Sequence, residues 1–193
     1  MEMLIGLMAC VGGGLLLMVI AYAVMYNSLI GKKNQVDYAY SGIDVQLKKR
    51  HDLIPNLVAT VKQYMEHERG LLERITELRA RATASNLPES ERLHAEAQLS
   101  GALRSLMIAV ENYPQLKANE NFLHLQASLN DIEEQIAAAR RAYNAAVTDY
   151  NNAIEMFPTN LVAGMMGLKR RAVFEAEESE RETPQVAQLF KQS

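Results

Sequence analysis

The first part of the chain is apolar without interruption, and the remainder alternates apolar and polar positions with a helical period. Residues 3–25 contain no charged side chain. At about 1.5 Å per residue, a helix of this length extends roughly 34 Å, slightly more than the ~30 Å hydrocarbon core of a bilayer. Lipid offers the backbone no hydrogen-bond partners, so a spanning segment of this kind forms a helix. The pattern predicts a transmembrane helix within residues 1–30.

Two other interpretations of the apolar run fit it less well. A cleaved signal peptide begins with basic residues and has a shorter apolar core, whereas only Glu2 and the amino terminus precede this run. A buried helix of a soluble protein is seldom apolar over such a length. The basic residues nearest the run all follow it, so the positive-inside rule predicts an amino terminus outside the cell and a cytoplasmic body. These basic residues are Lys32, Lys33, Lys48, Lys49 and Arg50.

Small residues recur at every fourth position within the span, at Gly6, Cys10 and Gly14. Such a row lets helix backbones approach closely in lipid, so it predicts a face for self-association. The alternative is that glycine is simply tolerated there, since it is common in membrane helices. Cys10 is the only cysteine, which excludes an intrachain disulfide, and within the apolar run it acts first as a small hydrophobic residue.

After the span, apolar residues keep a three- and four-residue spacing over residues 34–85, which predicts one long helix that is nearly continuous with the anchor. Pro55 lies inside it. Proline removes one backbone hydrogen bond and clashes with the carbonyl of His51, so we expect a kink or a break there. The apolar face continues through Ile54 and Val58, which favours a kink over a reversal of the chain. The inward positions are Val36, Tyr40, Ile43, Leu47, Ile54, Val58, Val61, Met65, Leu72, Ile75 and Leu78.

Two further helices are expected. A turn at 86–88 precedes the first, which ends at Tyr113–Pro114 because the residue before a proline avoids the helical conformation. The last long helix begins at an asparagine cap, Asn119 or Asn121, and stops at Pro158. Its apolar residues form a heptad-like seam over about five repeats. The seam consists of Phe122, Leu125, Leu129, Ile132, Ile136, Ala139, Tyr143, Ala146, Tyr150 and Phe157.

The expected fold is therefore all-α: an N-terminal transmembrane helix followed by an antiparallel long-helix bundle with coiled-coil-like packing, because strand-like runs and hairpin dipeptides are absent. We expect the bundle to occupy residues 31–174 and the acidic residues 175–193 to form a flexible tail. The helix predicted for residues 34–85 is about 77 Å long, and the next only about 36 Å. Part of the last helix is then left without a partner in its own chain, and a neighbouring subunit is the expected cover.

Amide and acidic side chains gather around the proline in the first long helix and recur along the later helices. One interpretation is a polar cluster that binds a ligand or fixes the register of a neighbouring helix, as a buried asparagine does in coiled coils. The other is local: helix caps and satisfied core amides, with Asp52 and Asn56 bonding the carbonyls that Pro55 frees. The group around the proline is Asp44, Gln46, Asp52, Pro55 and Asn56.

Little in the chain indicates catalysis. His67-Glu68 begins like a zinc-protease helix, but Leu71 occupies the place of the second histidine. The histidines lack metal-ligand spacing, no glycine-rich phosphate loop is present, and no serine has the context of a nucleophile. We therefore expect a non-enzymatic protein without metal or cofactor. The net charge of −3 is not that of a nucleic-acid-binding protein, so no nucleic acid is expected as a partner.

Several stretches, in order along the chain, resemble the LemA family. They are residues 26–64, 111–126 (ENYPQLKANENFLHLQ), 143–164 (YNAAVTDYNNAIEMFPTNLVAG) and the later FEA at 174–176. The resemblance implies a bacterial single-pass membrane protein with a cytoplasmic helical domain. It brings no catalytic residues, because the family has no established activity. The polar and aromatic residues singled out in its later blocks are Glu111, Asn112, Tyr113, Pro114, Asn119, Asn121, Asn144, Tyr150, Asn151, Pro158 and Asn160.

Two functions from different classes follow. The first is a membrane-anchored scaffold of the bacterial inner membrane that contacts membrane lipid and forms homo-oligomers, and that shapes the membrane or organises envelope proteins. The second is an adaptor or regulatory subunit of a membrane protease or of an envelope-stress signalling system, with a membrane-associated protein as its partner. An enzyme would instead need a cleft lined by strongly perturbed titratable groups.

Overall fold

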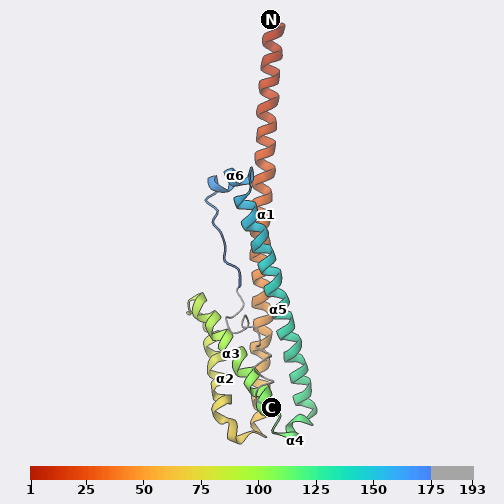
Figure 1. Ribbon diagram of the computed structural model, residues 1–193, viewed down its shortest axis with the longest axis vertical. Helices are drawn as coiled ribbons and strands as arrows, with labels where there is room; N and C mark the ends of the chain where they lie inside the picture. The colour runs from red at the N-terminus through yellow and green to blue at the C-terminus, as the bar shows by residue number, and fades with distance from the viewer. Residues whose placement is uncertain (175–193) are drawn as a thin grey trace, which may run out of the picture. The chain divides into compact units, whose positions relative to one another are not determined.

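The computed structural model describes residues 1–174, and the regular structure in that part of the chain is entirely helical, which confirms the all-α fold. The tail predicted for residues 175–193 lies outside the described residues. In chain order the elements are α1 (Glu2–Lys62), the 3-10 helix η1 (Glu66–Glu68), α2 (Arg69–Ala82), α3 (Glu89–Val110), α4 (Pro114–Lys117), α5 (Glu120–Glu155) and α6 (Thr159–Met165) (Figure 1).

Two compact units share the two longest helices. The bundle unit consists of residues 41–139, and the anchor unit consists of residues 1–40 together with 140–174 of the described chain. Both α1 and α5 therefore contribute one part to each unit. The domain boundary expected after residue 30 stays a prediction.

α1 continues from the apolar run into the body of the protein as one helix. It passes through Gly31 and through Pro55, so the chain does not reverse at the proline. This helix is long and apolar enough to cross a membrane, and its most apolar stretch is not buried within the protein. The anchor and the first helix of the body are thus a single element, as the apolar spacing predicted.

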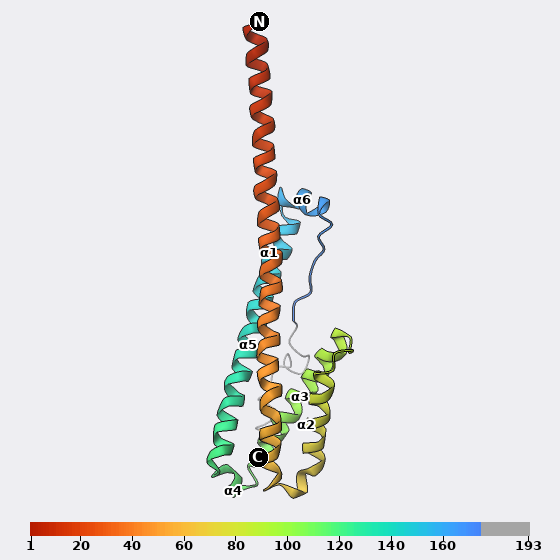
Figure 2. The same ribbon diagram turned by 180° about the vertical axis from the view of Figure 1, so that it is seen from behind.

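The prediction of a single helix over residues 34–85 is wrong, because α1 ends at Lys62 and the chain then reverses (Figure 2). The amides of Tyr64 and Met65 donate hydrogen bonds to the Val61 carbonyl at 3.0 and 3.1 Å, and η1 and α2 follow. Neither proline nor glycine marks this turn, which instead forms around the fully buried Met65. The three- and four-residue spacing runs through the turn unchanged, so periodicity could not locate it.

The core of the bundle unit takes apolar side chains from the end of α1, from α2, α3 and α4, and from the start of α5. Its most buried members include Leu57, Ile75, Leu106, Leu116 and Phe122, none more than 1 % exposed. Five elements converge on one apolar cluster, and burial of their apolar faces is the main force that holds these helices together.

The core of the anchor unit joins α1 to the later half of α5. Leu29 and Val36 of α1 pack with Val147 and Tyr150 of α5. The expectation that this half of α5 lacks a partner in its own chain is therefore wrong, because α1 begins long before residue 34. A homo-oligomer remains a prediction, but the unequal helix lengths no longer argue for it.

The end of α5 differs from the predicted seam. The helix ends at Glu155, and Phe157, expected to point inward, is 80 % exposed. The last turn before Pro158 is thus not part of the heptad pattern, and α6 begins directly after the proline.

Candidate functional site

A buried arginine lies in the bundle unit where α1, α3 and α5 meet. Arg50 Nη1 donates hydrogen bonds to Ser100 Oγ at 2.7 Å and to Glu133 Oε1 at 2.8 Å, and Nη2 donates to Glu96 Oε2. His51 Nε2 lies 2.9 Å from the other oxygen of Glu96. Arg50 itself is fully buried, and its Nε atom has no hydrogen-bond partner. The cluster links three helices through charge-assisted hydrogen bonds, which are stronger than neutral ones.

The electrostatics of this cluster keep Glu96 charged. Burial alone would raise the pKa of Glu96, since desolvation disfavours a carboxylate. The hydrogen bond from His51 and the positive charge of Arg50 outweigh burial and lower the pKa of Glu96 below its usual 4.5. Both of its oxygens already face a partner, so the geometry is that of a structural ion pair and not of a general base awaiting a substrate.

Pro55 and α2 are connected through the backbone of α1. Because proline has no N–H, the carbonyl of His51 loses the helical hydrogen bond it would otherwise accept. Arg79 Nε of α2 donates to that carbonyl at 2.6 Å. The expectation that Asp52 and Asn56 bond the freed carbonyls is wrong for His51, because the carbonyl of His51 accepts its hydrogen bond from Arg79 of α2.

An extended segment of the anchor unit is held along α5 by amide side chains. Residues 168–174 follow α6 and form no helix. Asn144 Nδ2 donates to the Phe174 carbonyl and Asn144 Oδ1 accepts from the Phe174 amide, both at 2.8 Å. Asn151 pairs in the same way with the amide and carbonyl of Arg171, at 3.0 and 2.9 Å. Each asparagine therefore bonds the segment as a neighbouring strand would.

Two tyrosines next to these asparagines bond the same segment. The hydroxyl of Tyr143 donates to the Ala172 carbonyl at 3.3 Å, and that of Tyr150 donates to the Lys169 carbonyl at 3.1 Å. The two Tyr-Asn pairs are seven residues apart, which places them on one face of α5. We call Tyr143, Asn144, Tyr150 and Asn151 the YN ladder.

Side chains of the extended segment add contacts to the ladder and to α1. Arg171 forms an ion pair with Asp37 of α1, and its guanidinium carbon lies 5.8 Å from the centre of the Tyr150 ring. Phe174 packs edge-on against Tyr143 with ring centres 5.0 Å apart. The hydrogen bonds of the ladder go to backbone atoms of the segment and so fit an extended chain, whereas the ring and charge contacts involve particular side chains.

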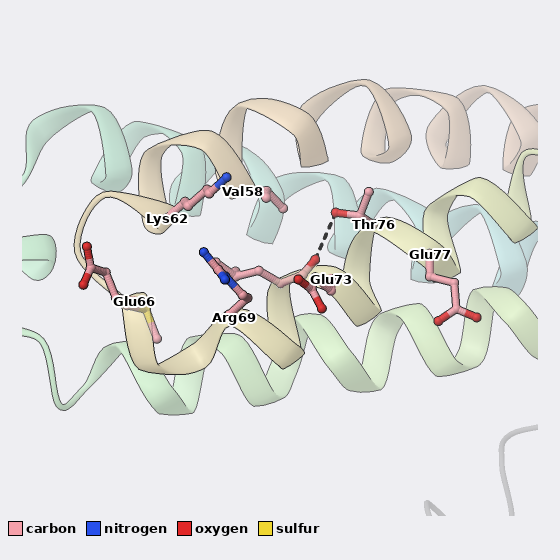
Figure 3. Close-up of a pocket in the computed structure, with 9 residues that line it drawn as sticks. Val58, Lys62, Glu66, Arg69, Glu73, Thr76 and Glu77 are labelled. Atoms are coloured by element: carbon pink, nitrogen blue, oxygen red, sulfur yellow. Dashed lines mark hydrogen bonds between the residues drawn. The ribbon is translucent and has the colours of Figure 1, made fainter.

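A pocket of about 700 Å³ lies in the bundle unit between the end of α1, η1 and α2. Lys62 and Arg69 point toward each other across it, and Glu66 and Glu77 lie at its two ends (Figure 3). Its lining contains no histidine, cysteine or serine, and the Thr76 hydroxyl donates to a carbonyl of its own helix at 2.9 Å. This composition provides no pair of nucleophile and base.

Comparison with known proteins decides the family. The model of the LemA family matches residues 39–187. The chain belongs to the LemA family. It is 28 % identical over 160 residues to Protein LemA of Metamycoplasma hominis, which covers 83 % of this chain and 73 % of that protein. It is 26 % identical over 193 residues to Magnetosome protein MamQ 2 of Paramagnetospirillum magneticum, covering 86 % of this chain and 71 % of that one. Magnetosome protein MamQ of Magnetospirillum gryphiswaldense is 35 % identical over 101 residues, covering 52 % of this chain and 37 % of that protein.

In this LemA-family chain, the carboxylates grouped around Pro55 from the sequence have separate partners. Asp44 lies 3.8 Å from Arg92 of α3. Asp52 forms an exposed ion pair with Lys48 at 2.7 Å, and the hydrogen bond from that lysine lowers the pKa of Asp52. Both contacts lie at the surface, the first between α1 and α3 and the second along α1.

The two amides of the same group also differ from each other. Gln46 is half-buried, and its Oε1 atom has no hydrogen-bond partner, whereas Asn56 is exposed. We find no geometry that joins them with the two carboxylates into one ligand site among the described residues.

The LemA-family block at residues 111–126 shapes the turn into α5. Asn119 caps this helix by accepting a hydrogen bond from the Phe122 amide at 3.0 Å, and its Nδ2 donates to Tyr64 at 3.0 Å. Pro114 begins α4. The other residues singled out in this block are Glu111, which pairs with Lys117, the half-buried Tyr113, and Asn112 and Asn121, which are exposed.

The LemA-family block at residues 143–164 holds the YN ladder, which brings Asn144, Tyr150 and Asn151 together on the extended segment. Pro158 precedes α6, and Asn160 lies within that helix with a buried Oδ1 atom that has no hydrogen-bond partner. The structure thus unites three of the residues singled out here, whereas Pro158 lies in the turn before α6 and Asn160 lies in α6 itself.

The pattern of the sequence predicted neither the buried Arg50–Glu96 pair nor the YN ladder, although both leave a signal in it. Arg50 continues the inward row of Leu47 and Ile54, and Glu96 precedes Leu99 and Leu103 at the same spacing. A charged residue at an inward position of an apolar seam is an expensive exception that predicts a buried partner. The Tyr-Asn pair repeated after seven residues was a second available signal. Its role was not evident, because the segment it bonds lies beyond the helix.

Proposed function

We propose that this LemA-family protein is a non-enzymatic, membrane-anchored helical scaffold that self-assembles at the bacterial inner membrane, where it shapes the membrane or organises envelope proteins. The observation that carries the proposal is that α1 is the membrane-crossing candidate and also contributes residues to the cores of both units. The same helix therefore belongs to both units.

The use of the polar side chains supports a structural role. The buried charges of Arg50 and Glu96 join helices, Arg79 replaces a missing backbone bond, and the YN ladder holds a segment of the chain. The hydrogen bonds described for these groups are all made within the protein. They leave no reactive atom beside an open site in the described residues.

Self-assembly is supported by the row of small residues at every fourth position of the span, Gly6, Cys10 and Gly14. An added Cβ at Gly6 or Gly14 would meet no atom within 4 Å, so a larger side chain there causes no clash within one chain. Gly12 is equally unobstructed but lies on another side of α1, two positions away from Cys10. It is therefore a matched control for the same substitution.

The test is chemical cross-linking of the full-length protein in lipid vesicles over a range of protein-to-lipid ratios. We expect oligomers in the wild type, fewer in the Gly6→Leu/Gly14→Leu variant, and wild-type amounts in Gly12→Leu, because a larger residue keeps backbones apart only at the contact face. A monomer at every ratio contradicts the scaffold. If oligomers persist in both variants, the scaffold proposal is retained and the contact between copies lies outside the row of small residues.

One observation favours the second candidate, an adaptor or regulatory subunit of a membrane protease or an envelope-stress signalling system. The YN ladder bonds the chain's own extended segment through backbone atoms, and backbone hydrogen bonds to an extended chain are one way in which proteins hold a partner peptide. An adaptor predicts that purification from native membranes returns one membrane-associated protein in near-stoichiometric amount. Recovery of further copies of the same chain alone favours the scaffold.

A further inference from the structure

The corner between α5 and α6 exposes four large apolar side chains. Met156 is 64 % exposed, Phe157 80 %, Leu161 62 % and Met165 79 %. Leu161 and Met165 are four residues apart and share one face of α6. An apolar patch of this kind on a protein surface marks a contact with another apolar or interfacial phase.

The opposite face of α6 is apolar as well. Val162 and Ala163 are buried in the core of the anchor unit, and residues 156–168 contain no charged side chain. α6 begins with the polar, half-buried Thr159 and Asn160, and its exposed positions are Leu161, Gly164 and Met165. A helix face exposed to water is normally polar, so an outer face without polar side chains indicates contact with protein or lipid. Among the described residues, α6 has protein on its inner face.

The position of α6 along α1 shows which phase meets its outer face. Val162 and Ala163 belong to the same core as Leu29, with Met25 packed against it. Leu29 is four residues, or about 6 Å, beyond the last residue of the apolar run. The headgroup layer adds roughly 5–8 Å to each side of the hydrocarbon core. Both ribbon views show α6 beside α1 at the end of α5 nearest the apolar span (Figures 1 and 2).

The charges and aromatic rings near this level are those of a membrane interface. Tyr22 and Tyr26 of α1 have ring centres 6.2 Å apart at the end of the span, where tyrosine is enriched in membrane proteins. Basic residues follow both segments that reach this level, and such residues are attracted to anionic headgroups. They are Lys32 and Lys33 on α1, and Lys169 and Arg170 after α6.

We propose that the α5–α6 corner, residues 156–165, rests in the headgroup layer of the bilayer that α1 crosses and forms a second membrane contact, which we call the α6 foot. The proposal rests on α1 crossing the bilayer, which is part of the proposed function, but it requires neither self-assembly nor a particular orientation. The foot fixes the anchor unit against the membrane and starts the extended segment 168–174 at the lipid surface.

The test uses the full-length chain with its only cysteine replaced (Cys10→Ala) and a fluorescent nitrobenzoxadiazole probe on one new cysteine. The probe positions are Leu161→Cys in the foot, Leu17→Cys in the apolar run, and the exposed Ala142→Cys, about 21 Å along α5 from Met156. Each protein is reconstituted in phosphatidylcholine–phosphatidylglycerol vesicles that carry nitroxide quenchers either near the headgroups or deep in the acyl chains.

We expect a blue-shifted probe at residue 161 that loses emission chiefly to the shallow quencher, a probe at residue 17 quenched by the deep one, and an unquenched probe at residue 142. Met165→Glu should reduce the quenching at residue 161, whereas Met165→Leu should preserve it. A probe at residue 161 that behaves like the one at 142, while residue 17 is quenched, overturns the foot and leaves the anchor intact. A blue shift without lipid quenching also overturns it, since a second copy of the chain then covers the corner. Loss of quenching at residue 17 overturns the anchor and the foot together.

Discussion

Arg50 stands at an inward position of the apolar seam of α1, between Leu47 and Ile54, and it is fully buried. A buried cation is tolerated only when its charge and its donors are matched, and Glu96 and Glu133 provide that match. The pair need not increase stability relative to an apolar replacement of both partners, but removal of one partner leaves an uncompensated charge. The cluster therefore restricts how α1, α3 and α5 are arranged.

The buried pair predicts asymmetric mutational effects. Arg50→Met should lower the free energy of unfolding by about 3–5 kcal/mol, because Glu96 is then buried without its main countercharge. The double variant Arg50→Met/Glu96→Leu should lose less than the sum of the single variants. Chemical denaturation in detergent, followed by helical circular dichroism, measures this. Lys48→Ala, which breaks the exposed pair with Asp52, should cost less than about 1 kcal/mol. Equal losses of unfolding free energy in Arg50→Met and Lys48→Ala would contradict the role of burial.

Glu96 also predicts how stability depends on pH. Its pKa is lowered in the folded protein, so its contribution is fully present above its usual value of 4.5 and is lost as the pH falls through the lower folded value. Wild type should therefore lose stability over this acidic range, and Glu96→Gln should show a flatter profile there. Denaturation midpoints between neutral and acidic pH test this. A Glu96→Gln profile parallel to that of wild type would exclude Glu96 as the titrating group.

At the scale of single elements, one helix and one extended segment depend on contacts with residues far away along the chain. α1 passes through Pro55 with the His51 carbonyl bonded by Arg79 of α2, and the extended segment after α6 is bonded by the YN ladder of α5. Each contact compensates for backbone groups that lack a helical partner, which is a general requirement for buried or half-buried backbone.

The link between Pro55 and Arg79 predicts coupling between two substitutions. Arg79→Met should destabilise the protein by about 1–3 kcal/mol, because it leaves the His51 carbonyl without a donor. In a Pro55→Ala background the loss should be smaller, since the new amide of residue 55 can bond that carbonyl. Unfolding free energies of the four proteins in this cycle give the coupling, expected at roughly 0.5–3 kcal/mol. Additive effects would show that Arg79 acts elsewhere.

The YN ladder predicts local protection from hydrogen exchange. Asn151→Ala removes two hydrogen bonds to Arg171, each worth about 1 kcal/mol net, so the Arg171 amide should exchange roughly tenfold faster or more. The exposed Asn152→Ala is the matched control and should leave that amide unchanged. Exchange followed by mass spectrometry on peptides that contain residues 168–174 measures both. Equal exchange in the two variants would show that the asparagine does not hold the segment.

The features that the sequence predicts are set by neighbouring residues, and those that it does not predict are set by contacts between distant ones. The apolar run, the continuity of α1, the Asn119 cap and the stop before Pro158 depend on neighbouring residues, and local pattern and stereochemistry are enough to find them. The turn after Lys62 and the Arg79 contact depend on residues that meet only after folding, and the spacing of apolar residues is the same on both sides of that turn. The ladder was visible as a repeat, but its partner segment carries no helical pattern.

At the scale of the whole molecule, one helix connects a membrane-crossing candidate to both compact units, and this continuity is the basis of the proposed scaffold. The proposed function requires that the span is retained in the mature chain and that the body lies on one side of the bilayer. The basic residues after the span predict a cytoplasmic body by the positive-inside rule.

Cysteine accessibility in bacterial spheroplasts, combined with the intact mass of the purified chain, tests this central claim most directly. In the Cys10→Ala background, a membrane-impermeant maleimide should label Glu2→Cys from outside and Ala142→Cys only after lysis, and the mass should include residues 3–25. Labelling of Ala142→Cys in intact spheroplasts, or a mature chain that begins after Met25, would contradict the account.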